Sequence, residues 1–325
     1  MLNIQSMDLS IIIVNWNSKD YLRRCLLSIW RETKGVDLEI IVVDAASFDG
    51  CENMLQVDFP QVRFIQSDKN VGFAKANNLG FMASTGECLL FLNPDTELAG
   101  AAIKTVYDDL QGLPKAGAVG CKLLNSDGTI QSSCIKAFPT LLNQLLDSEV
   151  LRRRLPLSRL WGMAPLFQPS SVPAEVDVVS GAFIMIRRGV FEKVGMFSTD
   201  YFMYSEDVDL CFKTNKSGWK NYYVPSATVT HHGGGSTVRS QVSTFAAVMM
   251  MESRWRYFCL SRGAMYGRLY RAEVGLMSLA RIALVLLPYV LDLLLHKDSG
   301  WKSVIVKWRA RLRWTIGLEK WVGCY

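Results

Sequence analysis

Short apolar runs alternate with amphipathic segments through the N-terminal part of the chain, and this alternation restricts the fold more than any other feature. The runs have the length of buried strands, and the segments between them have helical periodicity. The expected strands are residues 9–14, 38–43, 62–65 and 88–92, and the expected helices are residues 19–32 and 74–84. Strands that alternate with helices form a mostly parallel sheet covered on both faces. The sequence therefore predicts an α/β protein with a Rossmann-like sheet.

A polar turn follows each expected strand. The turns are residues 15–17, 44–47, 67–72 and 93–95. In an open α/β sheet the carboxyl ends of the parallel strands share one edge, and ligands bind in the crevice outside it. Backbone N–H groups and helix N-termini at that edge attract phosphate. We therefore expect a nucleotide to bind there.

The turn after the last of these strands is acidic. Asp95 follows Asn93 by two residues, and both side chains offer oxygen ligands. Mg²⁺ and Mn²⁺ are hard cations that prefer such ligands and are often shared with a substrate phosphate. A metal site and a plain Asn-Pro-Asp β-turn both fit this sequence.

A carboxylate pair, Glu206 and Asp207, begins a further expected helix, and Ser205 is expected to be its N-cap. A carboxylate in a first helical turn is held in a defined place, where it is able to accept a proton from a substrate hydroxyl. The alternative is that the pair merely complements the helix macrodipole.

The length of the chain and its cysteines limit the class of protein. With 325 residues it is long enough for one large or two modest domains. Its eight cysteines contain no CxxC pair, which favours reduced thiols and argues against a structural zinc site. The N-terminus lacks the basic segment of a signal peptide, so we expect the catalytic part to stay inside the cell. An insertion at 137–173 carries a basic triplet, 152–154, which is expected on a solvated helix face.

The C-terminal part combines an apolar segment with a basic tail. Residues 274–295 are apolar except for a few positions that include Arg281 and Asp292. Residues 296–325 carry seven Lys or Arg, two acidic residues and four Trp. This pattern favours a helix lying in a membrane interface, with a spanning helix and a buried core helix as alternatives. The basic tail fits an anionic lipid surface, and we expect no nucleic-acid partner.

Several segments, taken in order, resemble the family 2 glycosyltransferases of the GT-A fold, especially their bacterial rhamnosyltransferase-like branch. The matching segments are residues 11–17, 42–50, 70–80, 91–96, 180–182, 204–210 and 231–236. The resemblance runs from about residue 9 to residue 262. It implies a catalytic domain at 1–262, with a donor-binding half at 1–125 and an acceptor-side half at 126–262, followed by a helical membrane-associating tail at 263–325.

The resemblance also implies residues for the nucleotide-sugar donor. Asp44 would accept the N3–H of a uracil or thymine base, and Asn17 would lie beside that base. Gly72, Phe73 and Asn77 would border the ribose and the diphosphate. In this chain Ala45 stands where the family usually has Asn, which removes one expected polar contact.

For the metal, Asp95 matches the second acid of the family's DxD motif, and Asn93 stands at its first position. His231 resembles the histidine that helps to hold the metal ion or the diphosphate. The implied cofactor is Mg²⁺ or Mn²⁺, which Asp95 and His231 would hold.

The implied reaction is an inverting sugar transfer with Asp207 as the base, while Glu206 would hold the acceptor or orient the neighbouring Asp207. The expected donor is dTDP-L-rhamnose, followed by UDP-hexoses or UDP-HexNAc. The expected acceptor is a lipid-linked glycan at the cytoplasmic face of the inner membrane, to which the protein would attach peripherally. Nucleotidyl transfer to a sugar phosphate and an inactive sugar-binding scaffold are the alternatives.

Overall fold

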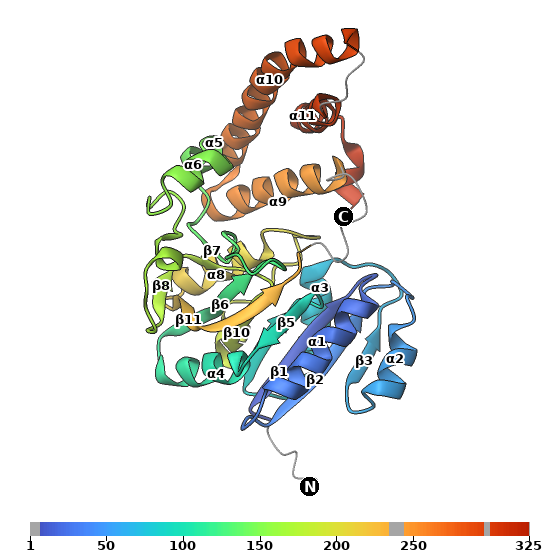
Figure 1. Cartoon of the computed structure of the whole chain (residues 1–325), viewed down its shortest axis with the longest axis vertical. Helices are drawn as coiled ribbons and strands as arrows, with labels where there is room; N and C mark the ends of the chain where they lie inside the picture. Colours follow the sequence, from blue (N-terminus) through green and yellow to red (C-terminus); the bar gives the residue numbers. More distant parts are fainter. Residues whose placement is uncertain (1–6, 234–243, 296–299, 325) are drawn as a thin grey trace. The chain divides into compact units, whose positions relative to one another are not determined.

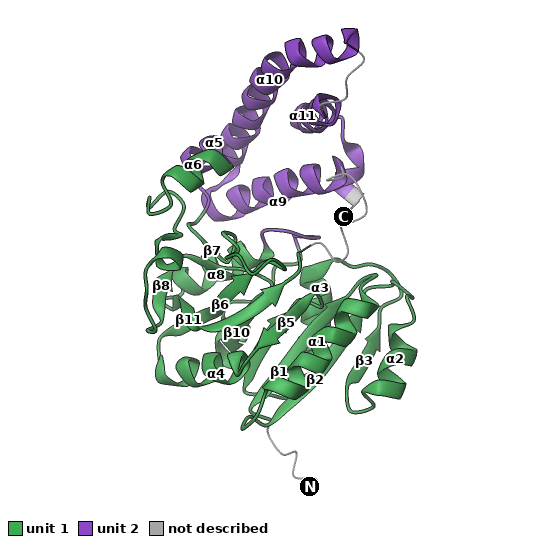
Figure 2. Cartoon of the chain, viewed as in Figure 1, with its two compact units in different colours: residues 1–138, 149–199, 206–236 green, residues 139–148, 200–205, 237–325 purple. Residues whose placement is uncertain are grey.

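The computed structural model describes residues 7–233, 244–295 and 300–324. The chain forms two compact units, which are coloured separately in Figure 2. Unit 1 comprises Met1–Phe138, Glu149–Thr199 and Glu206–Ser236, and unit 2 comprises Pro139–Ser148, Asp200–Ser205 and Thr237–Tyr325.

Unit 1 is built on a nine-stranded mixed sheet (Figure 1). Its strands are β1 (Leu9–Asn15), β2 (Leu38–Asp44), β3 (Arg63–Gln66), β4 (Cys88–Leu92), β5 (Thr96–Ala99), β6 (Ala116–Leu124), β8 (Ala174–Val176), β10 (Phe183–Arg187) and β11 (Lys220–His231). Eight of them run in the order β3-β2-β1-β4-β10-β6-β11-β5, and β8 pairs with β11. Strands β3, β2, β1 and β4 are mutually parallel, and β10 and β5 are antiparallel to their neighbours. A separate ribbon joins β7 (Ile135–Lys136) to β9 (Val178–Val179).

The helices of unit 1 follow the predicted alternation in the N-terminal half. They are α1 (Lys19–Glu32), α2 (Cys51–Asp58), α3 (Phe73–Met82), α4 (Ala102–Gly112), α6 (Glu149–Arg154), the short 3₁₀ helix η1 (Ala164–Phe167), α7 (Arg188–Lys193) and α8 (Glu206–Lys216). The four predicted strands and two predicted helices are present with ends within two residues of those expected. The basic triplet forms the end of α6, which contains no buried residue.

Strand burial explains why the apolar runs become the centre of the sheet. Every residue of β1 and of β4 is buried, as required of strands that are covered on both faces. Helix α3 lies very close to β1 at Gly80, where an added Cβ would lie 2.4 Å from Ile12 Cγ2. A larger residue at Gly80 would push α3 away from the sheet.

Unit 2 is helical. It contains α5 (Leu141–Leu145), α9 (Thr244–Arg262), α10 (Ala264–Leu294), α11 (Trp301–Thr315) and the 3₁₀ helix η2 (Lys320–Cys324). Glu252 on α9 is buried and accepts hydrogen bonds from Trp314 Nε1 on α11, at 2.9 Å, and from Arg256, also at 2.9 Å. The Arg271 guanidinium of α10 lies 4.8 Å from the centroid of the Trp314 ring. These contacts group α9 with the two following helices within unit 2.

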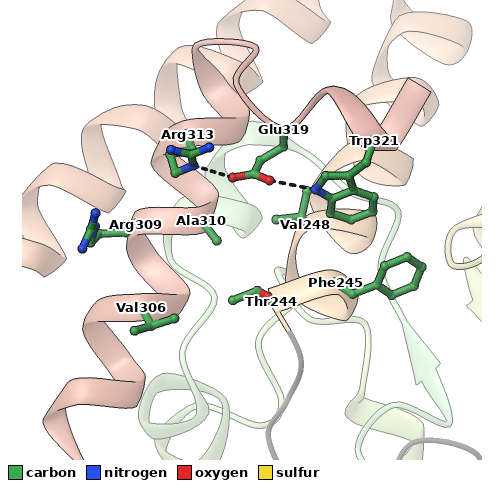
Figure 3. A pocket seen from close by; sticks show the side chains of 9 residues that line it. All are labelled: Thr244, Phe245, Val248, Val306, Arg309, Ala310, Arg313, Glu319 and Trp321. Atoms are coloured by element: carbon green, nitrogen blue, oxygen red, sulfur yellow. Dashed lines mark hydrogen bonds and ion pairs between the residues drawn. The ribbon is translucent and has the colours of Figure 1, made fainter. Parts of the chain in front are cut away.

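A cavity of about 390 Å³ lies between α9, α11 and η2 (Figure 3). Glu319 accepts hydrogen bonds from Arg313 Nε at 2.7 Å and from Trp321 Nε1 at 2.8 Å. The Trp321 ring also stacks on Phe245, with 5.0 Å between the ring centroids. These contacts fasten η2 to α11 and α9, so the cavity has ordered walls within unit 2.

Helix α10 presents an apolar surface along its C-terminal half. Within the described residues it is the helix long and apolar enough to cross a membrane, and 11% of its most apolar window is buried. At 31 residues it is about 46 Å long, more than a bilayer core requires. Its exposed side chains include Leu276, Leu279, Leu284, Leu286, Leu287, Leu291, Leu293 and Leu294. This helix is compatible with association with a membrane.

Candidate active site

The polar turns after β1, β2 and β3 lie side by side at one edge of the sheet. In the parallel register Asn15 is opposite Asp44, and Asp44 is opposite Gln66. The Ala45 N–H donates to the Asn15 carbonyl at 2.8 Å, and the Ser67 N–H donates to the Asp44 carbonyl at 2.9 Å. The predicted grouping of these turns is therefore what the structure shows.

Asp44 is fully buried and its carboxylate is already satisfied by the chain. One oxygen accepts from Asn15 Nδ2 at 2.8 Å and from the Ser47 hydroxyl. The other accepts from the Ser47 N–H and from Gln66 Nε2, both at 2.9 Å. Burial raises the pKa of Asp44, but the hydrogen bonds from Ser47, Gln66 and Asn15 outweigh burial and lower it overall. This geometry favours Asp44 as the residue that orders the turn after β2. It leaves the carboxylate little capacity to accept a hydrogen bond from a nucleotide base.

Asp44, Asp49 and Cys51 offer three ligand atoms within 4.8 Å of one another. Cys51 Sγ lies 3.6 Å from Asp44, and burial raises the pKa of this thiol, so the thiol donates to the carboxylate. Asp49 accepts the Lys19 N–H at 2.9 Å and the Cys51 N–H at 3.1 Å. Internal hydrogen bonds thus account for this cluster.

The other residues predicted to bind the donor lie in the turn after β1 and at or within α3. Asn17 is exposed in the turn after β1, with a φ of 52°. Gly72 precedes α3 with a φ of 82°, a conformation that favours glycine, and Phe73 is the first residue of that helix. Asn77 is buried and donates to the Phe73 carbonyl at 2.9 Å, while its Oδ1 has no hydrogen-bond partner in the described chain.

The structure brings together the three residues predicted near the metal. Strand β11 pairs with β5 so that His231 is opposite Thr96, which places the imidazole beside the turn before β5. His231 Nε2 lies 3.3 Å from Asp95 Oδ1 and 3.3 Å from Asn93 Nδ2. Asp95 is buried, and both side chains are mostly shielded from solvent. Residues 138 positions apart in the sequence therefore share one site.

These residues fit a divalent cation. Two cis ligand atoms of an octahedral ion with bonds of about 2.1 Å lie about 3 Å apart. The separation of 3.3 Å between His231 Nε2 and Asp95 Oδ1 is close to that value. The carboxylate of Asp95 is a ligand type suited to Mn²⁺ or Mg²⁺, and the imidazole of His231 adds a nitrogen ligand. Asn93 faces this pair with its Nδ2 group, which is a hydrogen-bond donor.

The carboxylate pair lies at the start of α8, as predicted, and both side chains are buried. Asp207 Oδ2 accepts from Lys136 Nζ at 3.2 Å and from the Gly181 N–H at 3.2 Å. Burial raises the pKa of Asp207, but the charge of Lys136 and the backbone hydrogen bonds lower it below its ordinary value. Burial, with repulsion from Asp207, raises the pKa of Glu206 to about 8. Asp207 is therefore ionised at neutral pH, and Glu206 is largely protonated.

The prediction that Ser205 is the N-cap is wrong. Tyr204 and Ser205 have φ values of 68° and 67°, whereas an N-cap residue normally has a β-region backbone. The buried Ser205 Oγ has no hydrogen-bond partner in the described chain. Two successive non-glycine residues in the left-handed region are strained, and such strain is concentrated at functional sites.

A short turn connects the cluster of Asn93, Asp95 and His231 with Asp207. The Asn93 N–H donates to the Ala182 carbonyl at 3.0 Å, and the neighbouring Gly181 N–H donates to Asp207. Ser180 in turn donates its N–H to the Cys134 carbonyl at 3.0 Å. The predicted metal residues and the predicted base are thus attached to one backbone segment of unit 1.

Sequence reasoning missed two residues of this site, Lys136 and Gln131. Gln131 contacts His231 through both ends of its amide, at 2.7 Å and 2.9 Å. Lys136 belongs to the two-residue strand β7, too short to be recognised as a strand from periodicity. The sequence does contain a turn signal close to Gln131. The Asp127-Gly128 turn after β6 marks where the chain reverses and returns toward the end of that strand.

Comparison with known proteins identifies the family. The model of glycosyl transferase family 2 matches residues 10–195, and that of glycosyl transferase family group 2 matches residues 157–319. The chain belongs to glycosyl transferase family 2 and is a glycosyltransferase. It is 31% identical over 252 residues to the N-acetylglucosaminyl-diphospho-decaprenol L-rhamnosyltransferase of Mycobacterium tuberculosis, covering 74% of this chain and 80% of that one. It is also 23% identical over 235 residues to the rhamnosyltransferase WbbL of Escherichia coli, covering 68% of this chain and 82% of that one.

Solved structures support the fold. A mannosyltransferase of Pyrobaculum calidifontis, in complex with GDP-Man and Mn²⁺, matches with a TM-score of 0.56 and 16% identity. That match covers 97% of this chain and 88% of the other. GalNAc-T7, solved with UDP, GalNAc and Mn²⁺, matches with a TM-score of 0.54 and 16% identity, covering 70% of this chain and 44% of the other. The predicted GT-A fold is thereby confirmed.

Proposed function

We propose that the protein catalyses an inverting, metal-dependent transfer of a sugar to a hydroxyl of a lipid-linked glycan, in the synthesis of a cell-surface polysaccharide. The observation that carries this proposal is the connection of the Asn93, Asp95 and His231 cluster to Asp207 through the turn at Gly181. The cluster of Asn93, Asp95 and His231 is suited to a diphosphate and its cation, and Asp207 is suited to accepting a proton.

The donor we propose first is dTDP-L-rhamnose, with UDP-hexoses and UDP-HexNAc next. The rhamnosyltransferase relatives favour this order. Asn17, Gly72, Phe73 and Asn77 would surround the nucleotide. Because Asp44 is occupied by hydrogen bonds within the chain, its part in base recognition would be to shape the turn that the base meets.

Asp95 and His231 would hold Mg²⁺ or Mn²⁺, with Asn93 beside them. When bound, the cation would neutralise the negative charge of the departing nucleoside diphosphate. The side chains are held for this task by the pairing of β11 with β5, so little reorganisation is needed when the donor arrives.

Asp207 would accept the proton of the acceptor hydroxyl as that oxygen attacks the anomeric carbon. A single displacement requires one base and no covalent intermediate, which is why one ionised carboxylate is enough. Glu206, protonated near neutral pH, would donate a hydrogen bond that orients the acceptor. Lys136 and the Gly181 N–H keep Asp207 ionised and fixed in place.

The acceptor would be presented at the cytoplasmic face of the inner membrane, where the protein attaches peripherally through α10 and α11. The exposed leucines of α10 would enter the acyl boundary. Lys302 and Arg309 of the amphipathic α11 would meet anionic headgroups.

The test is to incubate the protein with each nucleotide sugar, Mn²⁺ and a polyprenyl-diphosphate-linked acceptor, and to identify both products. We expect release of a nucleoside diphosphate and, by NMR, inversion at the anomeric carbon. Asp207→Asn should lower turnover by about 10²–10⁴-fold while donor binding persists. Asp108→Asn, on the exposed face of α4, is the matched control and should not change turnover.

Three outcomes would overturn the proposal. Release of pyrophosphate would indicate nucleotidyl transfer. Retention of configuration would exclude the single displacement. Normal turnover in Asp207→Asn would remove this residue from the role of base.

A further inference from the structure

The imidazole of His231 is held on the side away from Asp95 by a single side chain, that of Gln131. Gln131 Nε2 donates to the His231 carbonyl at 2.7 Å, and Gln131 Oε1 lies 2.9 Å from His231 Nδ1. One amide thus contacts both the backbone and the ring of the same histidine. This closes a small ring of hydrogen bonds around the residue that we assign to the cation.

The backbone carbonyl determines which way the amide points. A carbonyl oxygen only accepts hydrogen bonds, so the NH₂ group of Gln131 must face it. The amide oxygen then faces His231 Nδ1, and because this oxygen also only accepts, Nδ1 must carry the proton. The contact with Asn93 Nδ2, at 3.3 Å, is consistent with an Nε2 that accepts.

The position of Gln131 is itself fixed by the strand ends. Its N–H donates to the Leu123 carbonyl of β6 at 2.9 Å, and its carbonyl accepts the Cys134 N–H at 3.1 Å. Asn125 and Thr129 close the preceding turn, with 2.8 Å from the Asn125 N–H to the Thr129 carbonyl. His231 is fixed in turn by its place in β11. The amide therefore approaches the imidazole from a rigid support.

We infer that Gln131 is the positioning residue of the metal site: it selects the tautomer of His231 whose Nε2 lone pair faces Asp95, and it fixes the rotation of the ring. The inference rests on the proposed metal-dependent function. Residues that hold the second nitrogen of a metal-bound histidine typically affect metal affinity by 10–100-fold. Gln131 would act through His231 and would contact neither donor nor acceptor.

The experiment compares the full chain with Gln131→Leu, Gln131→Glu and the control Gln168→Leu, which removes an exposed glutamine. Mn²⁺ binding is followed by EPR of the free ion, with Mn²⁺ alone and with Mn²⁺ plus dTDP. We expect Gln131→Leu to weaken binding by about 10–100-fold. Gln131→Glu keeps an acceptor for Nδ1–H and should restore most of the affinity, and Gln168→Leu should bind like the wild type.

A second readout is independent of the metal. Long-range ¹⁵N–¹H NMR of the metal-free protein, assigned with His231→Ala, reports which ring nitrogen carries the proton. We expect the Nδ1–H form in the wild type and a mixture of tautomers in Gln131→Leu. Thermal unfolding of each variant shows whether the fold is retained.

The outcomes separate the inference from the function on which it rests. If the wild type binds no Mn²⁺ with or without dTDP, the metal-dependent function fails. If the wild type binds Mn²⁺ and Asp95→Asn abolishes binding, while Gln131→Leu binds normally and keeps the wild-type tautomer, the function stands and the inference about Gln131 is overturned.

Discussion

The ion pair between Lys136 and Asp207 leads to a quantitative prediction for the pH dependence of the reaction. At 3.2 Å, two unit charges attract by about 5 kcal/mol at an effective dielectric constant of 20 and by about 1.3 kcal/mol in bulk water. Lys136 is about one-third exposed (34%), so the pair lies between these limits. Losing this attraction favours the neutral carboxyl, so Lys136→Met should raise the pKa of Asp207.

The sign follows from the proposed role of Asp207 as the base. A carboxylate accepts a proton only when it is ionised, so in that role activity would be lost as the pH falls through the pKa of Asp207. Lys136 lowers that pKa and would keep the enzyme active at lower pH. Removing the charge should therefore shift the acid limb of the kcat/KM profile upward, while turnover on the alkaline side of the limb is largely retained.

The assay is the release of nucleoside diphosphate over a range of pH. Lys136→Arg keeps the charge and should leave the limb near its original position. Lys220→Met removes a lysine from an exposed ion pair with Glu175 and serves as the matched control. An unchanged acid limb in Lys136→Met, with a uniformly lower rate, would refute the argument, because it would show that Lys136 does not set the ionisation of the base.

Three further predictions concern stability and membrane binding. Glu206 has a pKa of about 8 in the folded protein against an ordinary 4.5, so its carboxyl favours folding below about pH 4.5 and loses this effect as the pH rises toward 8. Glu206→Gln should therefore flatten the dependence of the free energy of unfolding on pH between these values, measured by urea unfolding. An unchanged dependence on pH would contradict the assignment. Asp44→Ala leaves several buried donors unpaired and should lower the free energy of unfolding by at least about 2 kcal/mol. A stability equal to that of the wild type would show that the turn after β2 is held by other contacts. Replacing Leu284, Leu287 and Leu291 with Gln should reduce flotation with anionic vesicles, even at high salt, because each leucine contributes about 1.5–3 kcal/mol when buried; undiminished flotation would place the attachment elsewhere.

The elements that sequence reasoning predicted well are those whose structure depends on local pattern. The buried runs that became β1 and β4 are continuous and apolar, and the sheet requires that of strands covered on both faces. The grouping of Asp95 with His231 was predicted through family resemblance, since neither residue alone indicates a ligand.

The features that sequence reasoning missed depend on contacts distant in the chain. Lys136 is 71 residues from Asp207, and Gln131 is 100 residues from His231, so no periodicity connects them. Ser205 has the side chain of an N-cap, but the turn before α8 places its backbone in the left-handed region and overrides that preference. The hydrogen bonds that Asp44 accepts within the chain could not be counted from the sequence for a similar reason, because they form only when three strands are aligned.

The pairing of β5 with β11 also determines when the site appears during folding. It joins Thr96 to His231, so more than a hundred residues must be enclosed before Asp95 and His231 meet. Closing such a long loop is entropically costly, and contacts between distant residues form slowly. A growing chain on the ribosome therefore has no complete Asp95–His231 pair, and so no complete form of the proposed cation site, until β11 has been made and docked. A divalent ion would stabilise the finished sheet and would give no help to the early folding of β1 to β4.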